Sequence, residues 1–295
     1  MTTNTISRSM LLPVMLCAVS VGPVMARAQH DETAGPPKVL MTTREYVKPG
    51  NGVAHEKTEA AAAAAQAAAK GSLYYLTLGS ITGEPRIVSL AGYDSMADVQ
   101  SRYEATMKIP GLKEKLDRLG DEDAALLTSE SSAIWRLRED LSSSRNVNIA
   151  DMRMAELVRV ETRPGHGSDF ETVAKNVIGA WDKADSSYHA AVFEMAFGHR
   201  KGPTYLVIMP MKSMARLDTL HDEHDAFMKA LGEDGSKSDT QAAKNGFVSS
   251  ESNLFAFSPR MSYVPESWVK SDPTFWNPKP KAMATPVKKD EKKPM

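Results

Sequence analysis

The order of apolar and polar positions in the first half of the chain predicts alternating strands and helices. Residues 39–47 are β-branched and Thr-rich, which is typical of a strand, whereas residues 55–70 are Ala-rich without a helix breaker. A Gly- and Pro-containing stretch near residue 83 predicts a hairpin turn. The expected elements are strand 39–47, helix 55–70, strands 73–78 and 86–93, a helix from 96 to about 127 divided at Pro110 and Gly111, and strand 133–138.

The second half of the chain shows the same order of patterns. Its expected elements are strand 154–162, helix 168–184, strands 188–197 and 204–211, helix 213–231, a further helix 240–247, and strand 253–257. Each half therefore reads as βαββαβ, which is the order of a ferredoxin-like unit.

Three blocks of sequence recur in the same order in both halves. REYVKPGNG (44–52) matches RVETRPGHG (159–167) at an offset of 115, PRIVSLAGYDSMADV (85–99) matches PTYLVIMPMKSMARL (203–217) at 118, and SESSAIW (129–135) matches SESNLFA (250–256) at 121. A repeat of this length indicates an internal duplication. We expect an α+β fold of two tandem ferredoxin-like units, residues 39–148 and 149–264, whose sheets cover each other in one closed barrel.

The stretch TTREYVKPG (42–50), with a helix and a hairpin after it, resembles the start of a NIPSNAP-type domain of the dimeric α/β-barrel superfamily. ELVRVETRPG (156–165) resembles a second, more diverged copy, and the likeness covers roughly residues 39–263. The resemblance implies a barrel with a pocket but names no catalytic residue. Sibling families of this barrel include cofactor-free monooxygenases and haem-degrading or haem-binding enzymes.

The two ends of the chain differ in composition from the rest. Arg8, an apolar stretch from Met10 to Met25 and the triplet Ala26-Arg27-Ala28 together predict a signal peptide over residues 1–28 and an exported, periplasmic or extracellular protein. Residues 29–38 are polar and predict a flexible segment. Residues 265–295 are rich in Pro and Lys; we expect 265–277 to lie against the folded body and the remainder to be free.

Charge and cysteine content narrow the classes of function. The chain has 36 Lys and Arg against 37 Asp and Glu, and without Arg8 and Arg27 the balance is 34 against 37, or −3. This predicts no general attraction to nucleic acid or, after signal cleavage, to membranes. Cys17 is the only cysteine and lies in the predicted signal peptide. The mature chain would then have neither a disulfide nor a thiol nucleophile. We expect it to be a monomer or a homodimer.

Arg44 and Arg159 are the strongest candidates for ligand contact, because they occupy equivalent strand positions in the two halves. If both face the barrel interior, their guanidinium groups could bind a carboxylate or another anion. The alternative is a structural ion pair with a nearby carboxylate, for which Glu45, Glu156 and Glu161 are the candidates.

The remaining candidates on the predicted strands are aromatic or titratable side chains. Tyr75, Trp135 and Tyr205 could line a ligand pocket, although such residues more often belong to a core. His189 and Glu194 could move protons in a pocket, but their odd spacing on one strand places them on opposite faces.

His221, His224 and Asp225 could offer two nitrogens and a carboxylate to a metal if they share one helix face. A solvated helix face explains them better, and we expect neither a metal nor a cofactor, with haem as the alternative cofactor. Two function classes remain: an exported barrel that binds a small molecule, anionic if the arginines hold it, and a cofactor-independent monooxygenase-like or haem-handling enzyme. The sequence does not decide whether the protein is an enzyme.

Overall fold

The computed structural model describes residues 35–143, 147–184 and 188–277. The strands are β1 (Val39–Val47), β2 (Leu76–Ser80), β3 (Arg86–Tyr93), β4 (Leu127–Leu137), β5 (Met154–Thr162), β6 (Ala191–Phe197), β7 (Thr204–Met211) and β8 (Phe247–Phe257). The helices are α1 (Gly52–Ala69), α2 (Met96–Met107), α3 (Leu112–Ala124), α4 (Gly167–Lys183), α5 (Ala215–Asp222), α6 (His224–Gly246), α7 (Glu266–Ser271) and α8 (Pro273–Trp276), with short 3₁₀ turns at Glu139–Leu141 and Ile149–Asp151.

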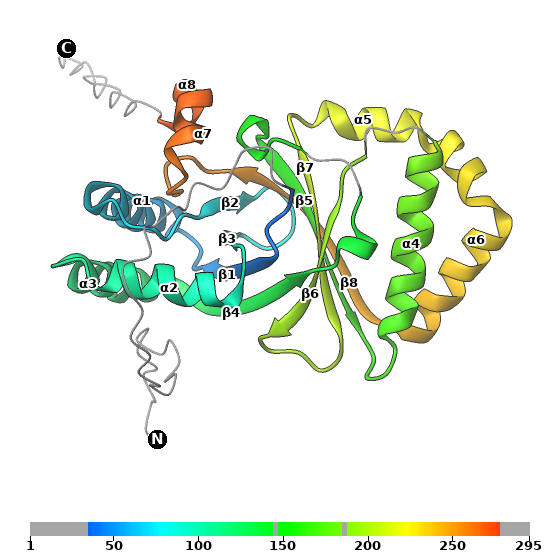
Figure 1. The fold of residues 1–295 in the computed structure, drawn as a ribbon, viewed down its shortest axis with the longest axis horizontal. Coiled ribbons are helices and arrows are strands. Elements are labelled where there is room, and N and C mark those ends of the chain that lie inside the picture. Colours follow the sequence, from blue (N-terminus) through cyan, green and yellow to red (C-terminus); the bar gives the residue numbers. More distant parts are fainter. Residues whose placement is uncertain (1–34, 144–146, 185–187, 278–295) are drawn as a thin grey trace, which may run out of the picture.

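The eight strands form a closed antiparallel barrel in the order β1-β3-β2-β8-β5-β7-β6-β4. The first four strands follow the order β4-β1-β3-β2, and the last four follow the matching order β8-β5-β7-β6. The two groups join where β2 pairs with β8 and where β4 pairs with β6. Helices α1, α2 and α3 lie on one side of the barrel, and α4, α5 and α6 lie on the opposite side (Figure 1).

Local sequence explains where the helices of the first group begin and end. Gly50, with φ at 85°, turns the chain from β1 into α1, which ends at Lys70 in the left-handed conformation. Ser95 caps α2 by accepting a hydrogen bond from the Asp98 backbone N–H at 3.1 Å. Gly111, with φ at 72°, separates α2 from α3 and confirms the predicted division of this helix.

Alternate residues of each strand face the barrel interior and form its main core. The interior set is Leu40, Leu76, Leu78, Val88, Trp135, Ala155, Leu157, Phe193, Met195, Leu206, Phe255 and Phe257. Trp135 is 3% exposed, and its indole N–H donates to Thr42 Oγ1 at 2.9 Å. A second, smaller core lies between β5, β7 and α4 and contains Val160, Phe170 and Tyr205.

Strands β4 and β8 begin six residues before the predicted starts at 133 and 253. Their first halves are polar and exposed, so the sequence pattern did not reveal them, but they pair with β1 and β5 along the backbone. Arg44 of β1 lies opposite Ser131 of β4, and Arg159 of β5 lies opposite Glu251 of β8. Matching positions of β4 and β8 are therefore 120 residues apart in the sequence. The predicted offset of 121 is therefore wrong by one residue, which would exchange the two faces of the strand.

The helices of the second group also depart from the prediction. Residues 213–231 do not form one helix, because α5 ends at Asp222 and α6 starts at His224. Helix α6 then continues to Gly246 through a kink at Gly232, whose φ of 69° suits glycine. Gly232 is not helical, with ψ at 170°, and divides α6 into two helical parts, so the separate helix expected at 240–247 corresponds to the part after Gly232 and starts earlier than predicted.

Helices α7 and α8 pack against the end of the barrel. Trp276 is 5% exposed and donates its indole N–H to the Ala150 carbonyl at 3.0 Å. The predicted signal peptide and the Lys-rich end of the tail fall outside the described residues. Within the described ranges, no helix has both the length and the apolar character needed to cross a bilayer.

Candidate functional site

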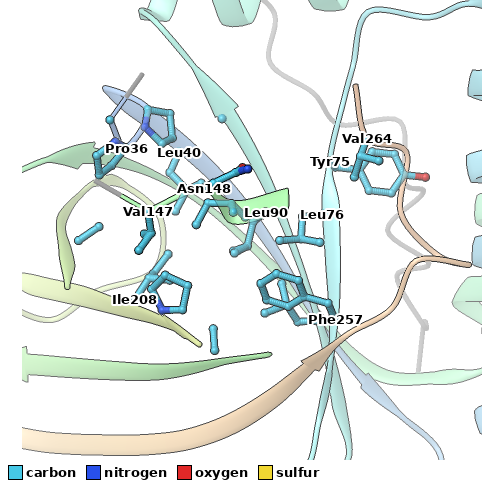
Figure 2. Close-up of a pocket in the computed structure, with 18 of the residues that line it drawn as sticks. Pro36, Leu40, Tyr75, Leu76, Leu90, Val147, Asn148, Ile208, Phe257 and Val264 are labelled. Atoms are coloured by element: carbon cyan, nitrogen blue, oxygen red, sulfur yellow. The ribbon is translucent and has the colours of Figure 1, made fainter. Parts of the chain in front are cut away.

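A cavity of about 210 Å³ opens at the end of the barrel where β1, β5 and β6 begin and where β3, β7 and β8 end. Figure 2 shows its apolar walls, which gather side chains from strands of both groups. The strand residues that line it include Leu40, Leu76, Leu90, Ala155, Ala191, Phe193, Ile208 and Phe257. Residues of three connecting segments complete the rim, namely Pro36 and Pro37, Val147 to Ile149, and Val264 to Trp268.

Few polar side chains reach this cavity. Tyr75, Arg102, Asn148 and His189 are among the lining residues. The Arg102 guanidinium is already held by two contacts to the Asp98 carboxylate, at 2.6 and 2.8 Å, so it is not a free cation at the wall. A ligand in this cavity would therefore meet a mainly apolar surface with a few polar side chains.

Tyr75 borders the cavity, but its hydroxyl points away from Leu76 and Phe257 (Figure 2). Burial raises the pKa of Tyr75 far above its usual range, and the negative charges of Glu59 and Glu45 raise it further. The Tyr75 side chain therefore stays protonated and lies close to these two carboxylates, behind the cavity wall.

Arg44 and Arg159 both face the barrel interior, but at the end opposite the cavity. Arg44 pairs in register with the buried Val88, and Arg159 pairs with the buried Leu206. Their side chains are 21% and 23% exposed. The two arginines predicted from the repeat therefore come together, yet neither lines the cavity.

Two carboxylates lie beside these arginines. Arg44 is 3.9 Å from Glu251, which belongs to the other group of strands, and Arg159 is 3.8 Å from Glu161. Of the three carboxylates expected as partners, Glu161 is the one that the structure places beside an arginine of this pair. Burial, followed by repulsion from Arg44, lowers the pKa of Arg159.

Arg86 is a third arginine at this end, which sequence reasoning missed. Its side chain is 3% exposed and contacts Glu251 at 2.6 Å, and its guanidinium lies over the rings of Tyr46 and Phe255. Its Nε is buried without a hydrogen-bond partner among the described residues. The signal was available, because Arg86 is two residues before Val88 and therefore shares its face of β3.

Three other candidates occupy different places. Trp135 belongs to the core between the cavity and the arginines and does not line the cavity. Tyr205 faces outward from β7 and stacks on Phe170 with ring centroids 3.9 Å apart. Glu194 pairs with Arg138 at 3.1 Å, whereas His189 precedes β6 and lines the cavity, so the two residues are apart although they do not share one strand as predicted.

The histidines considered for metal binding are exposed and lie on two helices. His221 is in the last turn of α5, whereas His224 and Asp225 begin α6, so the shared helix face assumed from the spacing does not exist. Among the described residues, the group whose ligand atoms converge instead lies near β1, α1 and α3, and it consists of the buried Glu45, His55 and Asp123 and the half-buried Glu59.

No family profile and no curated protein matches this sequence. Several solved structures are similar to it, and they belong to the dimeric α/β-barrel superfamily. An anthrone oxidase-like protein is 11% identical with a TM-score of 0.48, covering 75% of this chain and 92% of its own. A protein from Fusobacterium nucleatum that is assigned to the monooxygenases is 10% identical to this chain, with a TM-score of 0.47. The match covers 75% of this chain and 93% of that protein.

Chlorite dismutase from Candidatus Nitrospira defluvii, solved with imidazole, is 8% identical with a TM-score of 0.42, covering 80% of this chain and 95% of its own. At these identities and TM-scores the likenesses carry no argument about chemistry. The eight-stranded antiparallel barrel of mixed α+β type rests on the strand pairing of this chain itself.

Proposed function

We propose that this protein is an exported barrel that binds a compact, mainly apolar small molecule in the cavity beside β1, β5 and β6. The observation that carries this proposal is the cavity of about 210 Å³ with walls of Leu, Ile, Phe and Ala side chains. Apolar cavities of about 150 Å³ in proteins stay dry and bind benzene or xenon, so this volume is large enough for a small aromatic molecule.

A haem fits this cavity poorly. Pockets for drug-sized ligands measure about 300–1,000 Å³, which is more than this cavity offers, and a haem also needs an axial ligand and room for a flat macrocycle. His189 lines the wall, but the residues around it form a small apolar space. The described cavity therefore suits a compact ligand and does not fit a haem.

A monooxygenase-like reaction without a cofactor would need a group that takes a proton from the bound molecule. The Tyr75 hydroxyl points away from the cavity, and Arg102 is occupied by Asp98. Of the polar lining side chains named above, His189 is the one that could take this proton, and it stands in a mainly apolar wall, so binding is the function that the cavity supports best. The anionic ligand expected from Arg44 and Arg159 would bind at the other end of the barrel.

Two further parts of the proposal concern the origin and the location of the chain. The matching strand orders β4-β1-β3-β2 and β8-β5-β7-β6 support a tandem duplication of a ferredoxin-like unit. The NIPSNAP-type resemblance rests on TTREYVKPG (42–50) and its more diverged copy ELVRVETRPG (156–165), and export rests on the composition of residues 1–28.

The test is a calorimetric titration of indole and naphthalene into the purified protein. We expect saturable binding to the wild type and a loss of at least tenfold in affinity for Ala191→Leu, which fills part of the cavity. The matched control is Val248→Leu, at a position of β8 that is 56% exposed, and it should bind as the wild type does. Equal binding by Ala191→Leu, or no binding by the wild type to a wider panel of apolar molecules, would overturn the proposal.

A further inference from the structure

A buried polar cluster lies on the outer side of β1, under helices α1 and α3. Glu45 comes from β1, His55 and Glu59 come from successive turns of α1, and Asp123 comes from the last turn of α3. One ligand atom from each residue can be chosen so that all four atoms lie within 4.8 Å of one another. The side chains of Glu45, His55 and Asp123 are 5%, 2% and 0% exposed.

The histidine in this cluster is oriented as a metal ligand would be. His55 Nδ1 is 2.8 Å from Asp123 Oδ1, and in the tautomer that donates this hydrogen bond Nε2 carries the lone pair that a metal would accept. His55 Nε2 is buried, has no hydrogen-bond partner in the described part of the chain, and lies 3.7 Å from Glu45 Oε2. A carboxylate behind a histidine is the usual arrangement around a protein-bound metal.

The other half of the barrel shows that the fold does not need polar residues at this place. At the offset of 115 that relates β1 to β5 and α1 to α4, Val160, Phe170 and Ala174 occupy the positions of Glu45, His55 and Glu59. These three residues are 3%, 4% and 8% exposed and form an apolar core with Tyr205.

The contrast between the halves has an energetic meaning. Burying carboxylates together is costly unless positive charge or protons compensate, whereas the apolar packing of the other half has no such cost. A cation held between the carboxylates would offset that cost directly.

We propose that His55 Nε2, Glu45 and Glu59 bind a divalent first-row transition metal ion, and that Asp123 positions His55 through its hydrogen bond. One imidazole with two carboxylates is a mixed nitrogen and oxygen set, which suits Zn²⁺, Fe²⁺ or Mn²⁺ better than Ca²⁺ or a thiolate-seeking ion. The metal lies between β1 and its two covering helices, and it ties α1 and α3 to the barrel.

The first experiment measures metal content and binding on the full chain. After treatment of the protein with a chelator, we expect about one equivalent of Zn²⁺ or Mn²⁺ to bind in a calorimetric titration. Binding should raise the melting temperature of the protein and release protons, and the affinity for the metal should therefore rise with pH. Failure of Zn²⁺, Mn²⁺ and Fe²⁺ each to bind the wild type or to shift its melting temperature would overturn the proposal.

Variants then assign the ligands. His55→Ala should abolish the stoichiometric binding, and Asp123→Asn should weaken it by about 10–100-fold, as expected when the orienting partner of a ligand is lost. The triple variant Glu45→Val, His55→Phe, Glu59→Ala copies the apolar half, so it should fold and melt at a temperature that metal does not change.

The control is the double variant His221→Ala, His224→Ala, which removes two exposed histidines outside the cluster. It should bind metal as the wild type does. If the control loses the metal while His55→Ala keeps it, the bound ion is a surface ion and the proposed site is wrong.

Discussion

Arg44 and Arg159 occupy matching positions of β1 and β5, and both side chains face the interior at the same end of the barrel. Each is about one-fifth exposed and has a carboxylate at nearly 4 Å. The charge of Arg44 contributes to lowering the pKa of Arg159, second to burial, which places the two guanidinium groups close enough to repel. An anion between them would relieve that repulsion.

We therefore expect phosphate at low millimolar concentration to raise the melting temperature of the wild type at constant ionic strength. The shift should disappear in the double variant Arg44→Met, Arg159→Met, because its barrel end has lost both donors. Differential scanning fluorimetry measures this comparison. Equal shifts in both proteins would show that phosphate acts elsewhere and that the arginine pair is structural.

Arg86 should matter more to stability than Arg44, although both contact Glu251. Arg86 is almost fully buried, so Arg86→Met should lower the free energy of unfolding by about 1–3 kcal/mol, because Glu251 is left without its closest partner. Arg44 is more exposed and lies farther from Glu251, at 3.9 Å. Arg44→Met should therefore lower the free energy of unfolding by less than about 1 kcal/mol. Urea unfolding of the two variants gives the comparison, and the reverse order would contradict it.

Asp239 offers a test of pH dependence. Partial burial raises the pKa of its carboxyl group, although a hydrogen bond from Asn176 Nδ2 at 2.6 Å acts in the opposite direction. The folded state therefore binds this proton more tightly than the unfolded chain. The resulting stability is fully present below the unfolded pKa of about 3.9 and is lost as the pH rises through the folded value.

Asp239→Asn removes this titration and can still accept the hydrogen bond from Asn176. Relative to the wild type, the variant should therefore gain stability between pH 4 and pH 7, by a small amount because Asp239 is only partly buried. Urea unfolding at both pH values measures the change. A difference between the two proteins that is constant or opposite in sign would contradict this assignment.

The first half of the barrel should not form a stable monomer alone. Residues 36–148 contain β1 to β4, and without the second half β2 loses β8 and β4 loses β6 as backbone partners. The fragment would then expose two strand edges and one apolar sheet face. Size-exclusion chromatography with light scattering should show a dimer or an aggregate, whereas a soluble, folded monomer would contradict the fused-barrel account.

Strand and helix order followed directly from the sequence because apolar periodicity and Pro-Gly turns are local signals. The matching strand positions of Arg44 and Arg159 also followed, but their inward placement was left open, because alternation along a strand does not tell which of its faces is the interior. The early starts of β4 and β8 did not, because their exposed Ser and Glu residues show no apolar alternation, although they pair with β1 and β5 along the backbone.

The candidate site was predicted less well. Tyr75 and His189 border the cavity, but Trp135 and Tyr205 pack in cores, where aromatic residues commonly lie. Arg86 and the His55 cluster were missed because their partners are distant in sequence. His55 and Asp123 are 68 residues apart, and only the packing of α1 on α3 joins them.

A crystal structure of the full chain determined under xenon pressure would show whether the cavity accepts a compact apolar atom. Xenon is apolar and electron-dense, and it enters protein cavities that have room for a compact apolar ligand. We predict a strong xenon peak between Leu90, Ile208 and Phe257, and its loss in Ala191→Leu. A barrel whose cavity holds no xenon, or holds ordered water between polar groups, would contradict the account of an apolar ligand site.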